Sequence, residues 1–304
     1  MDITIQSLFN HKPIQAPQVR KGTLVSTTKI GVEVEMENVT NPPRISGWRA
    51  ERDGSLRNRG IEYVFDGPIG GSSACTRLKN LNKFLPTDKT FGPRTSVHIH
   101  VDVRDLTWKQ TCDMVILYAM AEPYLFEICG KSRDESIYSL AIYRGQKQIE
   151  NLITILERGP LRVNENYCTK YSAINLLALR DFGSLEFRGH HGSSDPDVLV
   201  NWINHLLKIK MYVQDTRRCP SDLPIIMRDK GVTQLLLELF GEELLSENIE
   251  SAIAAEDLMM VGVSIAEELM HDSKFKKVDK EVKEELHSQD LNQMNKLRSK
   301  LCAD

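Results

Sequence analysis

The chain has 304 residues, of which 41% are hydrophobic and 27% are charged, and its formal net charge is −3. This length and composition suit one large globular domain, or a domain with an appendage. No dense run of lysine and arginine is present. Nucleic acid and anionic membranes are therefore not expected as partners.

The six cysteines are scattered without a Cys-x-x-Cys pair. This spacing predicts reduced thiols, with neither a zinc knuckle nor a disulfide framework. No stretch approaches the roughly 18 apolar residues that a membrane span needs, and the first residues do not have the pattern of a secretion signal. We therefore expect a soluble cytoplasmic protein.

The predicted elements follow an irregular lead-in over residues 1–22. Strand character begins over residues 23–39, where residues 30–36 alternate apolar with acidic side chains at a period of two. Three further strands are predicted at residues 60–65, 96–103 and 184–189. Helices are predicted at residues 72–85, behind a serine cap, and at residues 107–129, 148–157 and 195–217.

Beyond Pro224 the pattern becomes wholly helical, with helices predicted near residues 233–240, 246–255, 257–270 and 278–300. We therefore predict a domain over residues 23–220 and a helical C-terminal extension over residues 221–304. The fold class is α+β, and the alternating strands predict an antiparallel sheet with an apolar convex side and a charged concave side.

Polar residues on the predicted strands come in pairs that share one face, because residues i and i+2 of a strand point the same way. The pairs, with a lone glutamate on the second strand, are Glu33 and Glu35, His98 and His100, Glu186 and Arg188, and Glu62. Carboxylates about 5 Å apart repel by roughly 3 kcal/mol at an effective dielectric of 20. Carboxylates with an imidazole suit Mg²⁺ or Mn²⁺ that bridges nucleotide phosphates.

Each pair taken alone has a plainer interpretation. A Glu-x-Glu pair is typical of a solvated strand face, His-x-His of hydrogen-bonded strand histidines as much as of a metal pair, and Glu-x-Arg of a cross-strand salt bridge. The occurrence of such pairs on separate strands favours a common site. The run Gly189-His190-His191-Gly192 is interpreted as the loop that leaves the last strand, outside the ligand set.

Several motifs then occur in one order over roughly residues 25–215. They are Gly31-Val32-Glu33-Val34-Glu35, Trp48 with Asp53-Gly54-Ser55, Gly60-Ile61-Glu62-Tyr63-Val64 with Pro68, Ser96-Val97-His98-Ile99-His100-Val101, Asn175, and Leu185-Glu186-Phe187-Arg188. Together they resemble the amidoligase family, in the superfamily of glutamine synthetase and glutamate-cysteine ligase. The resemblance implies a curved antiparallel sheet of the glutamine synthetase type, with helices on its convex face and Mg²⁺ on its concave face.

The resemblance also implies roles for particular residues. The implied metal ligands are Glu33, Glu35, Glu62, His98 and Glu186. His100 and Arg188 are implied as catalytic groups beside the phosphates, and the implied nucleotide contacts are His100, Arg188, Asn175 and Lys170. Tyr171 is implied near substrate or nucleotide, and Trp48, Arg52 and Asp53 along an acceptor pocket.

The implied activity is ATP-dependent ligation of a carboxylate to an amine through an acyl phosphate, with cofactors ATP and Mg²⁺ or Mn²⁺. Its substrates would be small molecules, peptides or proteins, in a bacterium or in the host cell of a virus. Two other classes stay open. One is a hydrolase or nuclease that uses the same carboxylates on two metals about 4 Å apart, and the other is a non-catalytic binding or structural protein. The helical extension would dock a partner, close over the site or assemble a homo-oligomer.

Overall fold

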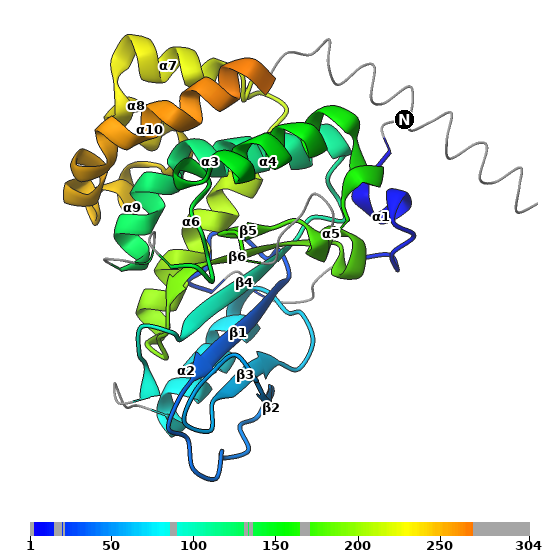
Figure 1. Ribbon diagram of the computed structural model, residues 1–304, viewed down its shortest axis with the longest axis vertical. Coiled ribbons are helices and arrows are strands. Elements are labelled where there is room, and N and C mark those ends of the chain that lie inside the picture. The colour runs from blue at the N-terminus through cyan, green and yellow to red at the C-terminus, as the bar shows by residue number, and fades with distance from the viewer. Residues whose placement is uncertain are drawn as a thin grey trace, which may run out of the picture.

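The computed structural model describes residues 3–14, 20, 22–85, 90–130, 133, 136–164 and 171–269. Within these residues the fold is α+β, with one six-stranded antiparallel sheet in the order β2-β3-β1-β4-β6-β5 (Figure 1). The strands are β1 (Ile30–Met36), β2 (Trp48–Arg52), β3 (Ile61–Phe65), β4 (Ser96–Asp102), β5 (Ile174–Asn175) and β6 (Ser184–His191). The α+β class and the antiparallel sheet are confirmed.

The strands at residues 60–65, 96–103 and 184–189 are confirmed as β3, β4 and β6, and the strand segment at residues 23–39 narrows to β1. The edge strand β2 was not predicted. In β2 only Trp48 is buried and the next four residues are exposed. Its side chains therefore do not alternate between apolar and polar, although alternation is the usual signal of a strand.

Three long helices pack on one face of the sheet: α2 (Gly71–Phe84), α3 (Trp108–Cys129) and α6 (Pro196–Gln214). The first residues of α3 and α6 are fixed by side-chain caps, because Thr107 forms a capping box with Gln110 and Asp195 accepts from two backbone amides. The predicted serine cap of α2 was wrong. Gly70 is its N-cap, and any side chain there would clash with the carbonyl oxygens of residues 27 and 28.

The helical extension packs directly on the main domain. It comprises α7 (Asp222–Lys230), α8 (Val232–Phe240), α9 (Glu242–Ser246) and α10 (Ile249–Leu269), and α4 (Gln146–Arg158) lies nearby (Figure 1). Helix α10 lies along α3, where a side chain at Gly262 would meet the backbone of Met120. The two helices expected at residues 246–255 and 257–270 are one helix, since no breaker separates them. The helix predicted at residues 278–300 lies outside the described residues.

The N-terminal lead-in packs on the body of the protein. It contains the short helix α1 (Ile5–Leu8), and the backbone amide of Ile5 donates to the carbonyl of Leu106 at 2.8 Å. His11 donates from Nε2 to the carbonyl of Leu179 at 2.7 Å, next to α5 (Leu177–Phe182). No helix among the residues described above is both long and apolar enough to cross a lipid bilayer.

Strand β6 contains a β-bulge that decides which side chains reach each face. Val97 pairs with His190 and Ile99 pairs with Phe187, so two residues of β6 stand opposite the single residue His98. The extra residue places His190 on the same face as Phe187, packed against Trp202 of α6. The interpretation of residues 189–192 as a loop was therefore wrong for His190 and His191, which belong to β6.

Candidate metal centre on the open face of the sheet

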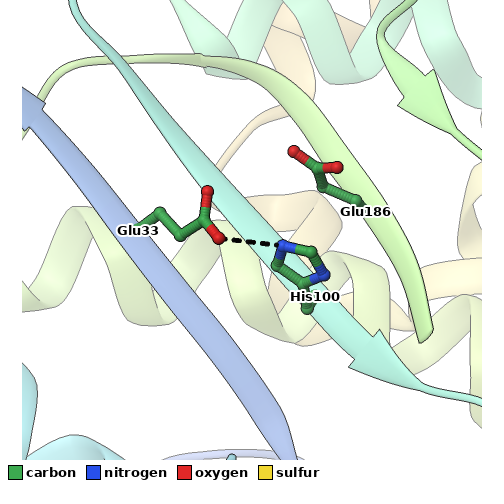
Figure 2. A group of neighbouring side chains, drawn as sticks. All are labelled: Glu33, His100 and Glu186. Atoms are coloured by element: carbon green, nitrogen blue, oxygen red, sulfur yellow. Dashed lines mark hydrogen bonds and ion pairs between the residues drawn. The ribbon is translucent and has the colours of Figure 1, made fainter. Parts of the chain in front are cut away.

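The sheet face opposite α2, α3 and α6, here called the open face, gathers the polar pairs from four strands. Strand pairing sets Glu33 opposite His98 and Glu35 opposite Glu62. It also sets His100 opposite Glu186. Side chains directly opposite each other in an antiparallel sheet are close neighbours. Figure 2 shows how Glu33 of β1, His100 of β4 and Glu186 of β6 lie across three adjacent strands.

Three overlapping groups on this face have the geometry to hold a metal ion. In each group, ligand atoms of three residues all lie within 4.8 Å of one another. The groups are Glu33 with His100 and Glu186, Glu33 with Glu62 and His98, and Glu35 with Asp53 and Glu62. Because Glu33 and Glu62 each belong to two groups, the groups form a continuous line across the sheet. We call the five carboxylates of these groups (Glu33, Glu35, Asp53, Glu62 and Glu186) the acidic row.

Glu33 lies between both histidines. Its Oε1 is 3.2 Å from His100 Nε2, and its Oε2 is 3.1 Å from His98 Nδ1. Burial alone would raise the pKa of Glu33, but hydrogen bonds and attraction from the two rings outweigh it and hold that pKa well below its usual range. Burial also opposes the charged form of His100, yet the carboxylates of Glu33 and Glu186 raise its pKa. An anionic Glu33 is therefore available as a ligand.

Ser96 orients two of the expected ligands. Its backbone amide donates to Glu35 Oε2 at 2.8 Å, and its hydroxyl donates to the same oxygen. The hydroxyl oxygen then accepts from His98 Nε2 at 2.8 Å. His98 Nδ1 lies between two carboxylates, 3.1 Å from Glu33 and 3.6 Å from Glu186. A histidine that donates one ring nitrogen to a fixed partner is oriented to bind a metal through the other, once that nitrogen is deprotonated.

The pKa of Glu62 shows that the carboxylates of the acidic row repel one another. Burial raises the pKa of Glu62 to about 9, with repulsion from Glu33, Glu35 and Asp53 as further causes. Carboxylates that repel each other in this way are stabilised by a hard divalent cation, which prefers oxygen ligands. The donor chemistry of the row therefore fits Mg²⁺ or Mn²⁺.

Glu186 is held by two neighbours. Asn175 donates from Nδ2 to Glu186 Oε2 at 2.6 Å, and Arg188 donates from Nη1 to Glu186 Oε1. Burial would raise the pKa of Glu186, but His98, His100 and Arg188 together lower it. Asn175, which we expected at the nucleotide, has its amide directed to Glu186 of the acidic row. Lys170, the other expected nucleotide contact, lies outside the described residues.

A cavity of about 320 Å³ opens over one end of the acidic row. Its lining includes Arg52 and Asp53, the residues for which we predicted an acceptor pocket, and also Tyr171. Trp48, expected there too, is not among the lining residues; it packs edge-on against Phe65 and donates to the carbonyl of Arg77 in α2.

Two further residues that line this cavity, Arg94 and Tyr138, were not predicted from the sequence. Arg94 lies 5.0 Å from the ring of Tyr138, and both side chains line the cavity. Asp53 joins the metal groups although its Asp-Gly sequence predicts only a turn. That role depends on β2 lying beside β3, which the sequence pattern did not show.

A second, wider pocket of about 450 Å³ opens beside the other end of the row and shares Glu33 with the first cavity. Its lining includes His100 and Phe182, whose rings meet edge to face at 5.6 Å. Lys12 and Lys29 also line it. The packed lead-in and the loop before β1 thus bring positive charge to a pocket next to the acidic row.

The chain was compared with known proteins. No protein-family model matches it, and no curated protein matches its sequence. The geometry of the open face is therefore the basis for a functional assignment.

Proposed function

We propose that this protein is an ATP-dependent carboxylate-amine ligase of the amidoligase type, with a sheet of the glutamine synthetase kind. The observation that carries the proposal is the acidic row, a continuous line of ligand groups on one face of an antiparallel sheet. The motifs that resemble the amidoligase family supply all the carboxylates of this row, including Asp53, which was expected along the acceptor pocket. A hydrolase or a non-catalytic protein needs no nucleotide, and this difference separates the alternatives.

The acidic row would hold Mg²⁺ or Mn²⁺, which when bound neutralises the phosphates of ATP and positions them. Glu33 and Glu62 each contribute to two ligand groups, so each would be available to a metal ion in either of its groups. Ser96 keeps Glu35 and His98 in place. The protein side chains would position the reactants and balance their charge, which are the main contributions of an enzyme to phosphoryl transfer.

Arg188 is the residue best placed to stabilise the charge that develops on the transferred phosphoryl group. Its Nη1 donates to Glu186 and approaches His98 Nδ1 at 3.4 Å, so the guanidinium lies directly over the row. Its Nε is buried without a hydrogen-bond partner among the described residues, and the side chain lines the 320 Å³ cavity. A donor held ready in this way favours the transition state, because no reorganisation is needed when charge develops.

The two pockets suggest where the reactants bind. In the wider pocket, the ring of Phe182 is 66% exposed and could stack on the adenine base of ATP. The two lysines of the same pocket could bind its phosphates. The narrower cavity offers Arg52 and Arg94 for a carboxylate substrate. ATP would phosphorylate that carboxylate with release of ADP, and an amine would then displace phosphate from the acyl phosphate to leave an amide.

Calorimetry with a non-hydrolysable ATP analogue, with and without Mg²⁺, tests the proposal. We expect binding that requires Mg²⁺ and that is lost in Glu35→Ala. Glu51→Ala is the matched control, because Glu51 stands opposite Glu62 but belongs to none of the three groups. Binding of Mg²⁺ without nucleotide would favour the hydrolase, and binding of neither would favour the non-catalytic protein.

A further inference from the structure

The bulge of β6 includes Arg188, whose side chain reaches the acidic row, and a bulge disrupts the regular hydrogen bonds of a ladder. Arg188 and Gly189 together stand opposite His98. The backbone amide of Arg188 donates to the carbonyl of Ala173 at 2.8 Å, on the β5 side. The carbonyls of the two bulge residues therefore need donors from elsewhere, since buried carbonyls are nearly always paired.

Arg133 supplies these donors. It donates from Nε to the carbonyl of Gly189 at 3.1 Å and from Nη2 to the carbonyl of Arg188 at 3.4 Å. Nη2 also donates to the hydroxyl of Ser139 at 3.1 Å. Arg133 is only 5% exposed, and burial lowers its pKa. A buried guanidinium directed to backbone carbonyls is costly to desolvate, so its three hydrogen bonds must offset that cost.

Contacts with the C-terminal end of α3 fix the same segment. His191 donates from Nδ1 to the carbonyl of Cys129 at 2.6 Å. Gly189 lies so close to α3 that a Cβ atom there would stand 3.4 Å from the ring of Phe126. The chain that follows α3 thus contacts the bulge through Arg133 and through the end of the helix itself.

We propose that Arg133 is a positioning residue that holds the β6 bulge and thereby directs Arg188 toward the acidic row. This inference rests on the proposed function for its catalytic consequence, because that function gives Arg188 its role. The bulge also decides the face of His190. In a regular strand His190 would share the open face with Glu186 and Arg188, since alternate residues point the same way.

The position of His190 therefore reports on the bulge without any assay of activity. Burial in the bulged register lowers the pKa of His190 to about 3. The experiment follows the His190 ring by NMR over pH in the full chain, and measures binding of a Mg²⁺-loaded, non-hydrolysable ATP analogue. The variants are Arg133→Met, which removes all donors, and Arg133→Lys, which keeps the charge but not the forked geometry.

Lys210→Met is the matched control. Lys210 is also a buried cation, 2% exposed, that donates to a backbone carbonyl, but its partners are Asp102, the last residue of β4, and Asp105, and neither belongs to the bulge. A general loss of stability would appear in this control too. We expect it to lower the melting temperature and to leave both His190 and nucleotide binding as they are.

In Arg133→Met we expect the His190 pKa to move toward its ordinary value near 6.5 and nucleotide binding to weaken about tenfold. Arg133→Lys should give a His190 pKa and a nucleotide affinity between those of Arg133→Met and the parent protein. If Arg133→Met does not fold, Arg133→Lys alone tests the inference. A His190 pKa and an affinity unchanged in Arg133→Lys or Arg133→Met would overturn the inference. If the parent binds no nucleotide, the proposed function fails, while the His190 titration still tests the bulge.

Discussion

Two clusters of charged side chains in this protein are built on opposite principles. Beside the end of β4, Asp102 accepts from Arg104 at 2.9 and 2.6 Å, and Lys210 donates to Asp105 at 2.8 Å. Each carboxylate there has its own cation. The acidic row of the open face has five carboxylates, and among the described residues its ion pairs are with one arginine and two histidines.

This difference in charge balance indicates that the cluster beside β4 is a structural network and that the acidic row is a binding site. Paired charges stabilise a fold when each desolvated group has a partner, and no further ligand is then needed. The acidic row has a surplus of negative charge, which adds to burial in raising the pKa of Glu62 to about 9. Such a surplus costs stability and is expected where a cation or a charged reactant restores the balance. The following predictions test this contrast, from the largest expected effect to the smallest.

The largest effect is expected on metal affinity in Glu33→Ala. Glu33 belongs to two of the three ligand groups, so its loss should weaken Mg²⁺ binding by more than about 100-fold, since even outer residues of metal sites contribute 10- to 100-fold. Calorimetric titration with Mg²⁺ measures the change. Glu37→Ala is the control, because Glu37 accepts from the amide of Arg57 and belongs to no group. Equal losses in both variants would contradict the contrast.

Glu62→Gln should stabilise the metal-free protein. The folded-state pKa of Glu62 is raised from 4.5 to about 9, so stability is greatest below pH 4.5 and falls as the pH rises toward 9. Glutamine resembles the protonated acid and removes this loss, which should amount to about 2 to 3 kcal/mol at pH 7. Urea unfolding at pH 5 and pH 8 measures it. A variant less stable than the parent at pH 8 would refute the prediction.

Lys210→Met should destabilise the protein without changing its affinity for Mg²⁺. The substitution removes the cation of the balanced network and leaves Asp105 and the carbonyl of Asp102 without it, at a cost of about 2 kcal/mol. Mg²⁺ affinity should not change. Thermal unfolding and Mg²⁺ titration of the same sample measure the two quantities. A loss of Mg²⁺ binding here would show that the two clusters are not independent.

The smallest effect is expected in Ser96→Ala. Ser96 donates to Glu35 and accepts from His98, so its hydroxyl orients ligands without binding the ion itself. We expect Mg²⁺ affinity to fall about tenfold, as for other residues that orient metal ligands. Ser194→Ala is the control, since the Ser194 hydroxyl is also buried but donates to the carbonyl of Leu85 and contacts no carboxylate of the row. An unchanged affinity in Ser96→Ala would show that Glu35 and His98 need no such support.

The sequence pattern predicted the centre of the fold well and its edges poorly. In β1 and β4, alternation between buried and polar residues revealed both the strand and the face of Glu33 and His98, because a regular strand has a period of two. In β2 that alternation was missing, so Asp53 was not recognised as a neighbour of Glu62. In β6 the extra residue of the bulge switches the faces of the residues that follow it, so His190 lies on the helix-covered face.

Roles that depend on tertiary contacts were the hardest to predict. The hydrogen bond from Asn175 to Glu186, eleven positions along the chain, was not predicted. Arg133 had no recognisable signal, because its partners are backbone carbonyls of a strand 55 residues away. Side-chain spacing within one element says which residues share a face, but it does not say which loop returns to support them.

The central claim is that the acidic row binds divalent cations, and one calorimetric measurement tests it most directly. Mg²⁺ is titrated into the full chain at pH 7 in two buffers that differ in their heat of ionisation. Because Glu62 has a pKa of about 9, binding must displace its proton, and the heat should differ between buffers by the equivalent of about one proton. Glu62→Gln should remove that difference. Absence of Mg²⁺ binding by the parent protein would contradict the account.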